Sequence, residues 1–150
     1  MTDKKTFKGR PALAGNVEGK AAVSHIGLNT AATYIEVITK GSNSGVCKDH
    51  DNKDLFEKDL AGAVLCLPQT IGSSSAACMF MTIAEKGIAP KAMLFANHID
   101  SLAACGLLMA DNWLGKRIVT VDLLGDDFLD AVKTGDTVKV HEDGTVEIQG

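Results

Sequence analysis

Short apolar runs through the middle of the chain indicate where the core strands lie. Three such runs are predicted to be strands: 63–67, 92–96 and 117–121. The first two are apolar at every position, and the first is stopped by Pro68. A strand without alternation of polar and apolar residues is typical of a sheet that is covered on both faces. These strands are therefore expected at the centre of the molecule.

Apolar residues recur at helical spacing in the segments that separate these strands. The segment 76–84 shows this spacing and predicts one helix. A second helix is predicted to be capped near Asp100 or Ser101 and to run through 102–110. Because 102–110 is apolar on almost every side, this second helix is expected to be deeply buried. A short amphipathic helix is predicted at 126–133.

The two ends of the chain carry shorter candidate strands separated by turn-prone residues. Four segments are predicted as strands here, and the last two form a hairpin: 20–24, 33–38, 137–141 and 145–148. The stretch 9–19, rich in Gly and Pro, is expected to be an ordered loop, and the polar stretch 39–58 a long connection.

This order of elements predicts a single domain over 1–150 with an α/β fold. Strand–helix–strand–helix–strand in the middle implies parallel pairing with right-handed crossovers. The strands at both ends imply an antiparallel or barrel-like part. We therefore predict a β/β/α domain with a central, partly parallel sheet, barrel-like strands and flanking helices. The polar segment 1–8 is expected to be flexible.

Charge and composition disfavour several classes of function. The net charge of −4 argues against nucleic acid as a partner, because phosphate binding needs a basic surface. No apolar run is long enough to cross a membrane, and the polar residues 1–8 do not form a secretory signal, so a cytoplasmic protein is expected. The four cysteines form no C-x-x-C pair, and buried free thiols are expected. Cys47 and His50 share a polar loop, but two ligands are too few for a structural zinc, so no metal is expected on this chain.

A cluster of serines between a predicted strand and a predicted helix is the main candidate for chemistry. Gly72 is followed by Ser73, Ser74 and Ser75, directly before the helix at 76–84. Ligands of α/β sheets bind at the carboxyl ends of strands, and the free N–H groups of a helix start attract anions. One serine there is explained by helix capping, but three exceed what capping requires. The chain lacks the lysine of a P-loop and the second glycine of a hydrolase nucleophile turn.

Four motifs in order along the chain resemble the swivel domain of aconitase X: 9–15, 60–68, 71–75 and 87–92. The resemblance runs from about residue 9 to 121 and implies a swivelling domain that brings a catalytic serine to an iron site on a larger body. By this resemblance Ser74 is the first candidate for the base that removes a proton from carbon, and Ser73 is the second. Superfamily members often have Gly-Ser-Ser-Arg, so Ser75 replaces an arginine here.

The missing arginine implies that the carboxylate of the substrate is recognised by other groups. Arg10 is one candidate, because a guanidinium binds a carboxylate through two nitrogens, and a loop-packing role is about equally plausible. Gly72 and Ser75 are expected to contribute close backbone approach and hydrogen-bond donors. His98 follows a predicted core strand and is a further candidate to face the pocket of Ser74, although an ordinary polar surface position is the more common role.

A partner is expected because the chain does not activate a serine alone. Ionising a hydroxyl near neutral pH costs roughly 11–12 kcal/mol, whereas a helix start contributes at most about 2 kcal/mol. The resemblance implies a large subunit that holds iron or an iron–sulfur cluster, with none bound by this chain alone. Because the chain starts with its own methionine and ends after a hairpin, a separate small subunit, active only in a heterodimer, is expected.

The resemblance implies a hydro-lyase, or dehydratase, whose substrate is a small hydroxy acid or hydroxy-amino acid. We expect cis-3-hydroxy-L-proline, and mevalonate 5-phosphate is the alternative. A rival from another class is a swivelling phosphocarrier, because 135–140 fits the closing hairpin of such domains. That rival needs a histidine where the chain has Ser74, Ser75 and Ala76. A non-catalytic binding domain is the third hypothesis.

Overall fold

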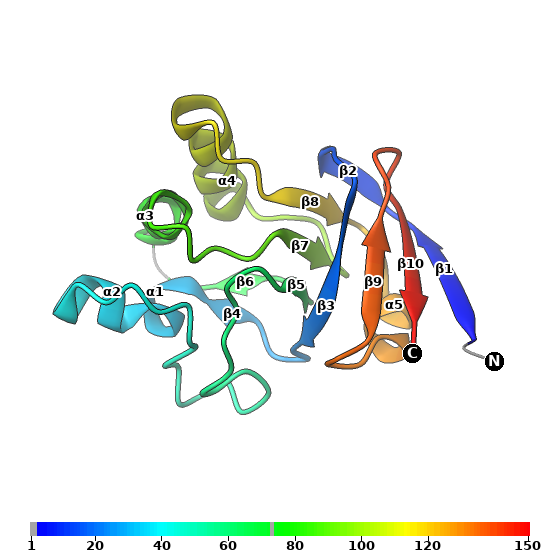
Figure 1. Cartoon of the computed structure of the whole chain (residues 1–150), viewed down its shortest axis with the longest axis horizontal. Helices are drawn as coiled ribbons and strands as arrows, with labels where there is room; N and C mark the ends of the chain where they lie inside the picture. Colours follow the sequence, from blue (N-terminus) through cyan, green and yellow to red (C-terminus); the bar gives the residue numbers. More distant parts are fainter. Residues whose placement is uncertain (1–2, 73) are drawn as a thin grey trace.

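An eight-stranded sheet forms the centre of the computed structural model, which describes residues 3–72 and 74–150 (Figure 1). Its strands lie side by side in the order β1 (Lys4–Lys8), β10 (Thr145–Gln149), β9 (Thr137–Val140), β3 (Val17–Val23), β5 (Val64–Leu67), β7 (Ala92–Phe95), β8 (Val119–Asp122) and β2 (Arg10–Leu13). Strands β3, β5, β7 and β8 are parallel, and the remaining pairs are antiparallel. A separate parallel pair is formed by β4 (Leu28–Asn29) and β6 (Thr70–Ile71).

The sheet curls so that its first and last strands are neighbours in the chain. Only Gly9 separates β1, at one end of the sheet, from β2 at the other. The Gly9 amide donates to the Gly144 carbonyl in the β9–β10 hairpin, at 3.0 Å. A Cβ atom on Gly9 would lie 2.5 Å from the backbone oxygen of Asp122, so only glycine allows this close approach. This curl is the barrel-like part predicted from the strands at both ends.

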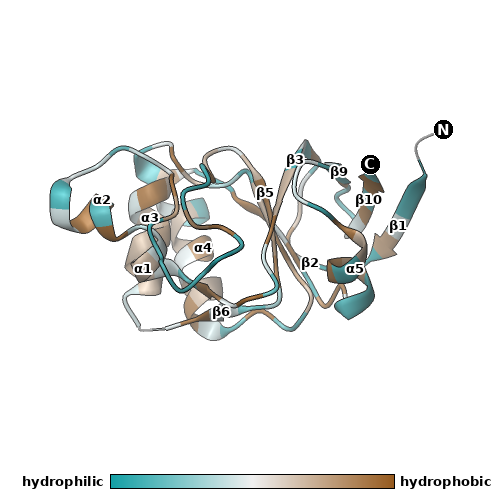
Figure 2. Cartoon of the chain, turned by 90° about the horizontal axis from the view of Figure 1, so that it is seen from below, coloured by the Kyte–Doolittle hydropathy of each residue, from teal (hydrophilic) through white to brown (hydrophobic). Residues whose placement is uncertain are grey.

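Five helices in the described residues lie on both sides of the parallel strands: α1 (Thr30–Thr33), α2 (Ile35–Lys40), α3 (Ala76–Glu85), α4 (Ser101–Leu114) and α5 (Asp126–Ala131). Helices α1 to α4 lie on one side, and α5 lies on the other beside the antiparallel strands (Figure 2). The molecule therefore has two hydrophobic cores that share the parallel strands as a common wall.

Successive residues of the central strands point alternately into the two cores. In β5, Leu65 and Leu67 face the helical core, whereas Val64 and Cys66 face the barrel core. All four residues of β5 are buried, as are all four of β7. Burial on both faces is the reason that these strands are apolar at every position. The predicted central strands, the flanking helices and the α/β fold class are confirmed.

The predicted strand at 33–38 is wrong, because this segment is helical. The Asn29 side chain accepts a hydrogen bond from the Ala32 amide and thereby starts α1. Within α2, Lys40 forms an ion pair with Glu36 one turn earlier, and Gly41 ends the helix in the left-handed conformation. These local bonds outweigh the weak strand preference of β-branched residues.

Two further expectations at the N-terminus also fail. Residues 1–8 were expected to be flexible and 9–19 to form a loop, yet Lys4–Lys8, Arg10–Leu13 and Val17–Val23 are strands. Strand β1 pairs with the free edge of β10, and Lys4 forms an ion pair with Glu147 on that strand. The ring of Phe7 packs edge-on against Phe128 of α5. Pairing of a sheet edge is a tertiary effect that the polar sequence of β1 does not indicate.

Helix α4 is present where predicted, and Asp100 caps it, but it is not deeply buried. Its buried residues are Ala103, Gly106, Leu107 and Ala110. Leu102, Leu108 and Trp113 are exposed on its outer side. None of the helices in the described ranges combines the length and apolarity needed to cross a membrane.

Candidate active site

Four polar segments meet at the carboxyl edge of the parallel strands. The chain leaves β5 through the segment 68–75, which contains the serines, and leaves β7 through 96–100. Asp122 is the last residue of β8, and Arg10, the first residue of β2, pairs with it in the sheet register. Because parallel strands end at the same edge, this edge collects the groups that the sequence places far apart.

The turn at Gly72 is fixed by its contact with Asn29. Gly72 has a φ of +106°, and a Cβ atom there would lie 2.9 Å from Oδ1 of Asn29. The two residues are close because β4 pairs with β6, with Asn29 opposite Ile71. Gly72 is thus required by backbone conformation and by space, whether or not it contacts a ligand.

Ser74 lies in the turn directly before α3, and its side chain is exposed. Ser75 occupies the N-cap position of α3 but makes no side-chain capping bond to the helix, while its carbonyl accepts the Met79 amide. Capping therefore does not explain the hydroxyl of Ser75. Ser73, the second candidate for the base, lies outside the described residues.

A cavity of about 200 Å³ adjoins this turn and is lined by Thr70, Ile71, Gly72, Ala76, Asp100 and Leu102. Oδ1 of Asp100 accepts hydrogen bonds from the amides of Leu102 and Ala103, both at 3.0 Å, and so caps α4. Oδ2 of Asp100 accepts a hydrogen bond from the Thr70 hydroxyl. Asp100 therefore ties the start of α4 to the segment that carries the serines.

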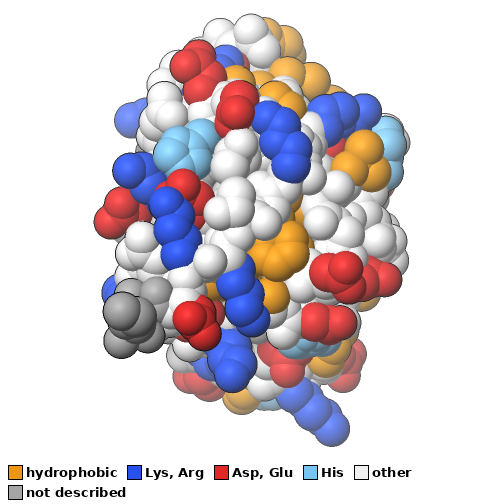
Figure 3. Space-filling view, turned by 90° about the vertical axis from the view of Figure 1, so that its right-hand side faces the viewer, with side chains coloured by type: hydrophobic (Ala, Val, Ile, Leu, Met, Phe, Trp, Pro, Cys, Tyr) orange, Lys and Arg blue, Asp and Glu red, His pale blue; other side chains and the backbone are white. Residues whose placement is uncertain are grey.

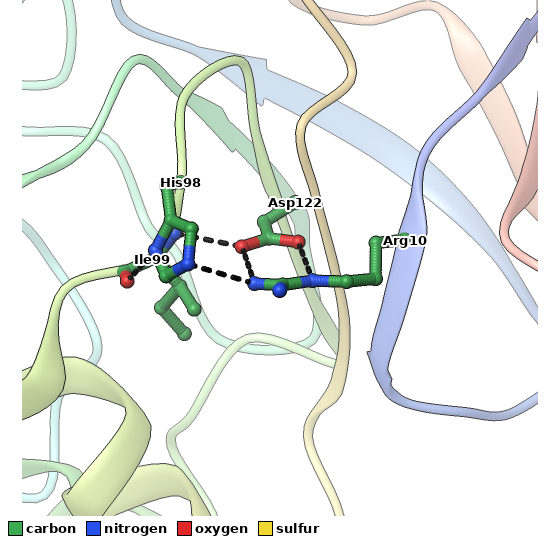
Figure 4. Close-up of polar contacts among 4 residues, drawn as sticks. All are labelled: Arg10, His98, Ile99 and Asp122. Atoms are coloured by element: carbon green, nitrogen blue, oxygen red, sulfur yellow. Dashed lines mark hydrogen bonds and ion pairs between the residues drawn. The ribbon is translucent and has the colours of Figure 1, made fainter.

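A second polar group surrounds Asp122, whose side chain is fully buried (Figure 4). Arg10 donates from Nε to Oδ1 at 2.9 Å and from Nη2 to Oδ2 at 2.6 Å. The Ile99 amide also donates to Oδ2, at 2.8 Å. The hydrogen bonds with Asp122, and then its negative charge, raise the pKa of the Arg10 guanidinium. This bidentate pair joins β2 and β8 to the segment after β7.

His98 is held in one tautomer by its two neighbours. Its Nε2 lies 3.2 Å from Nη2 of Arg10, and its Nδ1 lies 2.6 Å from the Ile99 carbonyl oxygen. Because a guanidinium only donates, Nε2 accepts and the ring proton lies on Nδ1, which donates to the carbonyl. The imidazole thereby connects Arg10 to the segment 96–100.

Comparison with known proteins identifies the family to which this fold and this sheet edge belong. Residues 6–148 match the family model described as the aconitase X swivel domain. The chain belongs to the aconitase X swivel-domain family. The match includes the turn at Gly72, the segment 96–100 and the Arg10–Asp122 pair. The family predicted from the four sequence motifs is confirmed.

Relatives and solved structures agree with the family over nearly the whole swivel domain. The phosphomevalonate dehydratase small subunit of Aeropyrum pernix is 29% identical over 145 residues, which cover 96% of this chain and 93% of the relative. The protein of the same name from Archaeoglobus fulgidus is 29% identical over 143 residues, with 95% and 97% covered. Thermococcus kodakaraensis aconitase X, in its holo form, has a TM-score of 0.80 at 25% identity, with 96% and 98% covered. The chain is thus a subunit of an aconitase X-like dehydratase.

In this swivel domain the predicted site residues fall into two groups. Gly72 lines the cavity beside the serine turn, and Ser74 and Ser75 follow it in the chain. Arg10 and His98 form the other group around Asp122 and are not among the residues that line that cavity. Two nitrogens of Arg10 are already bound by Asp122, so only its remaining edge is left for a substrate carboxylate. The short segment from His98 to Asp100 connects the two groups, because His98 contacts Arg10 and Asp100 lines the cavity.

The sequence interpretation missed Asp122 and the contact between Thr70 and Asp100. Asp122 did carry a signal, because it is an acidic residue directly after the apolar strand residues 118–121. Asp100 was predicted only as a helix cap, and its second oxygen shows that it also bonds Thr70. A contact between two loops is not encoded by spacing along the chain, so the Thr70–Asp100 pair had no such signal.

Within the ranges 3–72 and 74–150, no three His, Cys, Asp or Glu side chains form a group that fits a metal ion. Cys47 is fully buried, and burial raises the pKa of its thiol, while His50 packs against the ring of Phe56. Cys78 and Cys105 are exposed, against the expectation of buried thiols. The described residues therefore do not fit an iron centre.

Proposed function

We propose that this swivel domain is the small subunit of a metal-dependent hydro-lyase and that it contributes the catalytic serine. The observation that carries the proposal is the exposed Ser74 at the start of α3, in a chain related over nearly its full length to proteins named as dehydratase small subunits. The hydroxyl of Ser74 is exposed and lies beside a cavity at the carboxyl edge of the sheet. It is therefore accessible to a substrate that is bound mainly by another chain.

In the proposed reaction the ionised Ser74 accepts a proton from a substrate carbon, the C–H electron pair forms the double bond, and the C–O bond of the neighbouring carbon breaks. The leaving hydroxide takes up a proton from a donor on the large subunit and departs as water. The N–H groups of the first turn of α3 stabilise negative charge on the serine oxygen, although their contribution of about 2 kcal/mol is far below the cost of ionisation. Cationic groups and donors on a large subunit are therefore needed in addition. We assign the iron or iron–sulfur centre to that large subunit and the reaction to the cytosol.

The proposed substrate is mevalonate 5-phosphate, which is supported by the names of the relatives. Four curated relatives at 28–29% identity are all called phosphomevalonate dehydratase small subunits. At that identity a family can change its substrate while it keeps the reaction, because the substrate is bound by few side chains. The relatives therefore favour this substrate over the cis-3-hydroxy-L-proline expected from the sequence.

A specific observation keeps cis-3-hydroxy-L-proline as the second candidate. The carboxylate of Asp100 lines the cavity beside Gly72. A carboxylate there attracts the secondary ammonium group of hydroxyproline and repels a phosphate. The negative charge of Asp100 therefore favours binding of hydroxyproline and disfavours binding of mevalonate 5-phosphate in this cavity.

The test is a dehydration assay of this chain assembled anaerobically with the aconitase X-like large subunit from the same genome. Both substrates are supplied separately, and the loss of substrate and the formation of product are followed by mass spectrometry. We expect turnover of mevalonate 5-phosphate by the assembly and none by either chain alone. Turnover of cis-3-hydroxy-L-proline alone would reverse the order of the substrates. Dehydration by the isolated small subunit would refute the proposed division of labour.

The phosphocarrier hypothesis finds no support in this structure. The predicted hairpin is present, because β9 pairs with β10 on one side and with β3 on the other. However, the helix start that would need a histidine has Ser74 and Ser75. The nearest histidine along this edge, His98, has both ring nitrogens in hydrogen bonds. A phosphoryl group needs a ring nitrogen with a free lone pair, which His98 does not offer in this arrangement.

A further inference from the structure

Helix α4 places small residues against the protein and large apolar residues in solvent. Its buried side is made mostly of small residues, and a Cβ atom on Gly106 would lie 2.7 Å from the backbone oxygen of Ala77. On its outer side, Leu102 is 36% exposed, Leu108 46% and Trp113 73%. No charged residue interrupts the helix from Ser101 to Ala110. The outward side of a helix on a soluble protein is normally polar, so this one needs an explanation.

Two of the exposed apolar residues border the cavity beside the serine turn, and Leu108 lies at the other edge of the exposed side of α4. Ile71, which is also exposed, and Leu102 both line that cavity. Leu108 lines a second hollow of about 50 Å³ between α4 and the strands β2 and β8. Trp113 lies eleven residues after Leu102, which is about three helical turns, or about 16 Å along the same side of the helix. We call these four residues, Ile71, Leu102, Leu108 and Trp113, the α4 surface.

Large apolar residues are also exposed on α2, namely Ile35 and Ile38, whereas the antiparallel end of the sheet is built differently. The face formed by β1, β9 and β10 carries interspersed acidic and basic side chains (Figure 3), including the ion pairs Lys4–Glu147 and Lys8–Asp143. Helix α4 instead forms the upper rim of the molecule in Figure 1, with no other element outside it. An apolar surface at the rim, directly beside the serine turn, is typical of a protein–protein contact.

We propose that the α4 surface is where the large subunit docks, an inference that rests on the proposed function. A partner that completes the site must cover the cavity at Gly72, and any chain that covers it also lies over Ile71 and Leu102. A second copy of this chain on the same surface would block the cavity and exclude the chain that supplies the rest of the site. The large subunit is therefore the occupant, and it meets α4 with an apolar surface of its own.

The position of Trp113 gives a direct test, because it is the only tryptophan of the chain. The large subunit is prepared with its own tryptophans replaced by 4-fluorotryptophan, which is almost non-fluorescent, so that the tryptophan emission of the complex comes from Trp113 and its quenching by acrylamide can be followed. We expect quenching of Trp113 to fall sharply when the wild-type complex forms. Unchanged quenching of Trp113 in a complex that has formed would overturn the α4 surface as the docking site.

Two charge substitutions on the α4 surface test the same inference by affinity. Trp113→Glu and Leu108→Glu are expected to weaken the complex by roughly thirtyfold or more, because a buried aromatic or apolar anchor contributes about 2 kcal/mol. Ile38→Glu is the matched control, since Ile38 is a 59% exposed apolar residue on α2 rather than α4. The control is expected to bind as the wild type does. Circular dichroism and thermal unfolding check that each variant keeps its fold.

The outcomes separate a failure of this inference from a failure of the proposed function. If the wild-type chains form an active complex and both α4 variants bind with unchanged affinity, the large subunit docks elsewhere and only this inference falls. An equal loss in Ile38→Glu would also overturn the assignment to α4. If sedimentation shows that the free chain dimerises and that Trp113→Glu abolishes the dimer, a second copy occupies the surface. If the wild-type chains form no complex, the proposed function itself falls.

Discussion

Helices α3 and α4 pack against each other on one side of the sheet, yet they use their apolar residues in opposite ways. Helix α3 buries large side chains, among them Met79, Phe80 and Ile83. Helix α4 buries three small residues and Leu107, and it leaves Leu102, Leu108 and Trp113 outside. The close contact between Gly106 and Ala77 contributes to this difference, because it leaves no room for a side chain at position 106 of α4. An apolar helix in a sequence is therefore not evidence of burial on all sides.

The starts of the two helices differ as well. Asp100 caps α4 with two hydrogen bonds from Oδ1, and its other oxygen bonds Thr70. Ser75, at the equivalent position of α3, makes no side-chain capping bond. Within the described residues, the start of α4 is thus capped by the side chain at its N-cap position, whereas the start of α3 is not capped in this way. The four predictions that follow test the two helix starts and the packing of the two helices.

The largest effect is expected from the serine at the start of α3. Ser74→Ala should lower turnover of the assembled enzyme by about 10²–10⁴-fold, because it removes the proposed general base. Ser101→Ala, an exposed serine at the start of α4, is the matched control and should leave turnover unchanged. Rates are measured with each complex at equal concentration, after sedimentation shows intact assembly. Full activity of Ser74→Ala would move the base to Ser73 or away from this turn.

The contact between the two helices should be sensitive to a single methyl group. Gly106→Ala would place a Cβ atom 2.7 Å from the Ala77 backbone oxygen, which a flexible side chain cannot relieve. We expect a loss of about 1–3 kcal/mol in the free energy of unfolding from overpacking, which exceeds the ~1 kcal/mol that alanine gains over glycine in a helix. Urea unfolding measures it, with the exposed Asn112→Ala as the control. Stabilisation by Gly106→Ala would show that α3 and α4 leave room for a methyl group between Gly106 and Ala77.

The cap of α4 can be tested by removing its capping residue. Asp100→Ala should lower the free energy of unfolding by about 1 kcal/mol, because the first amides of α4 lose their acceptor. Ser101→Ala, at the exposed neighbouring position of the same helix start, is the control and should cost less. Thermal unfolding of the two variants side by side gives the difference. Equal losses would mean that the Asp100 side chain does not stabilise the start of α4.

The smallest effect is expected at the end of α4, as a dependence on pH. Two hydrogen bonds from Arg117, followed by its charge, hold the pKa of Asp111 below its ordinary value. The pair therefore stabilises the fold above the ordinary aspartate pKa, and this stabilisation is lost as pH falls through the lowered value. Between about pH 5 and about pH 3, Asp111→Asn should lose less stability than the wild type does. An identical acid dependence in both proteins would show that the pair contributes nothing.

Much of the fold was predictable, and the failures share a cause. The apolar strands β5 and β7 were predicted because burial on both faces leaves a continuous apolar run. The strand predicted at 33–38 failed because Asn29 and Gly41 start and end helices there, which outweighs the β-branched residues between them. Strand β1 was missed because only its pairing with β10, distant in the chain, makes it a strand.

The candidate site was predictable only in part. The serine turn was visible because three hydroxyls follow a glycine between a strand and a helix. Arg10 was predicted to bind a carboxylate of the substrate and His98 to face the pocket of Ser74, whereas the fold pairs Arg10 with the buried Asp122 and places His98 against Arg10. Whether they also contact a substrate stays a prediction. Their contact depends on strands β2 and β8 lying side by side, a pairing that no local spacing indicates.

The sequence by itself determined the family, the central strands and the serine turn, because each depends on residues that are close together in the chain. The tertiary structure alone decided which side of α4 meets solvent, which residues hold Arg10, and how β1 closes the barrel beside β10. The physical reason is that burial and pairing are properties of surfaces assembled from distant segments. An apolar residue in the chain is equally suited to a core and to a partner, and only the packed fold shows which one it faces.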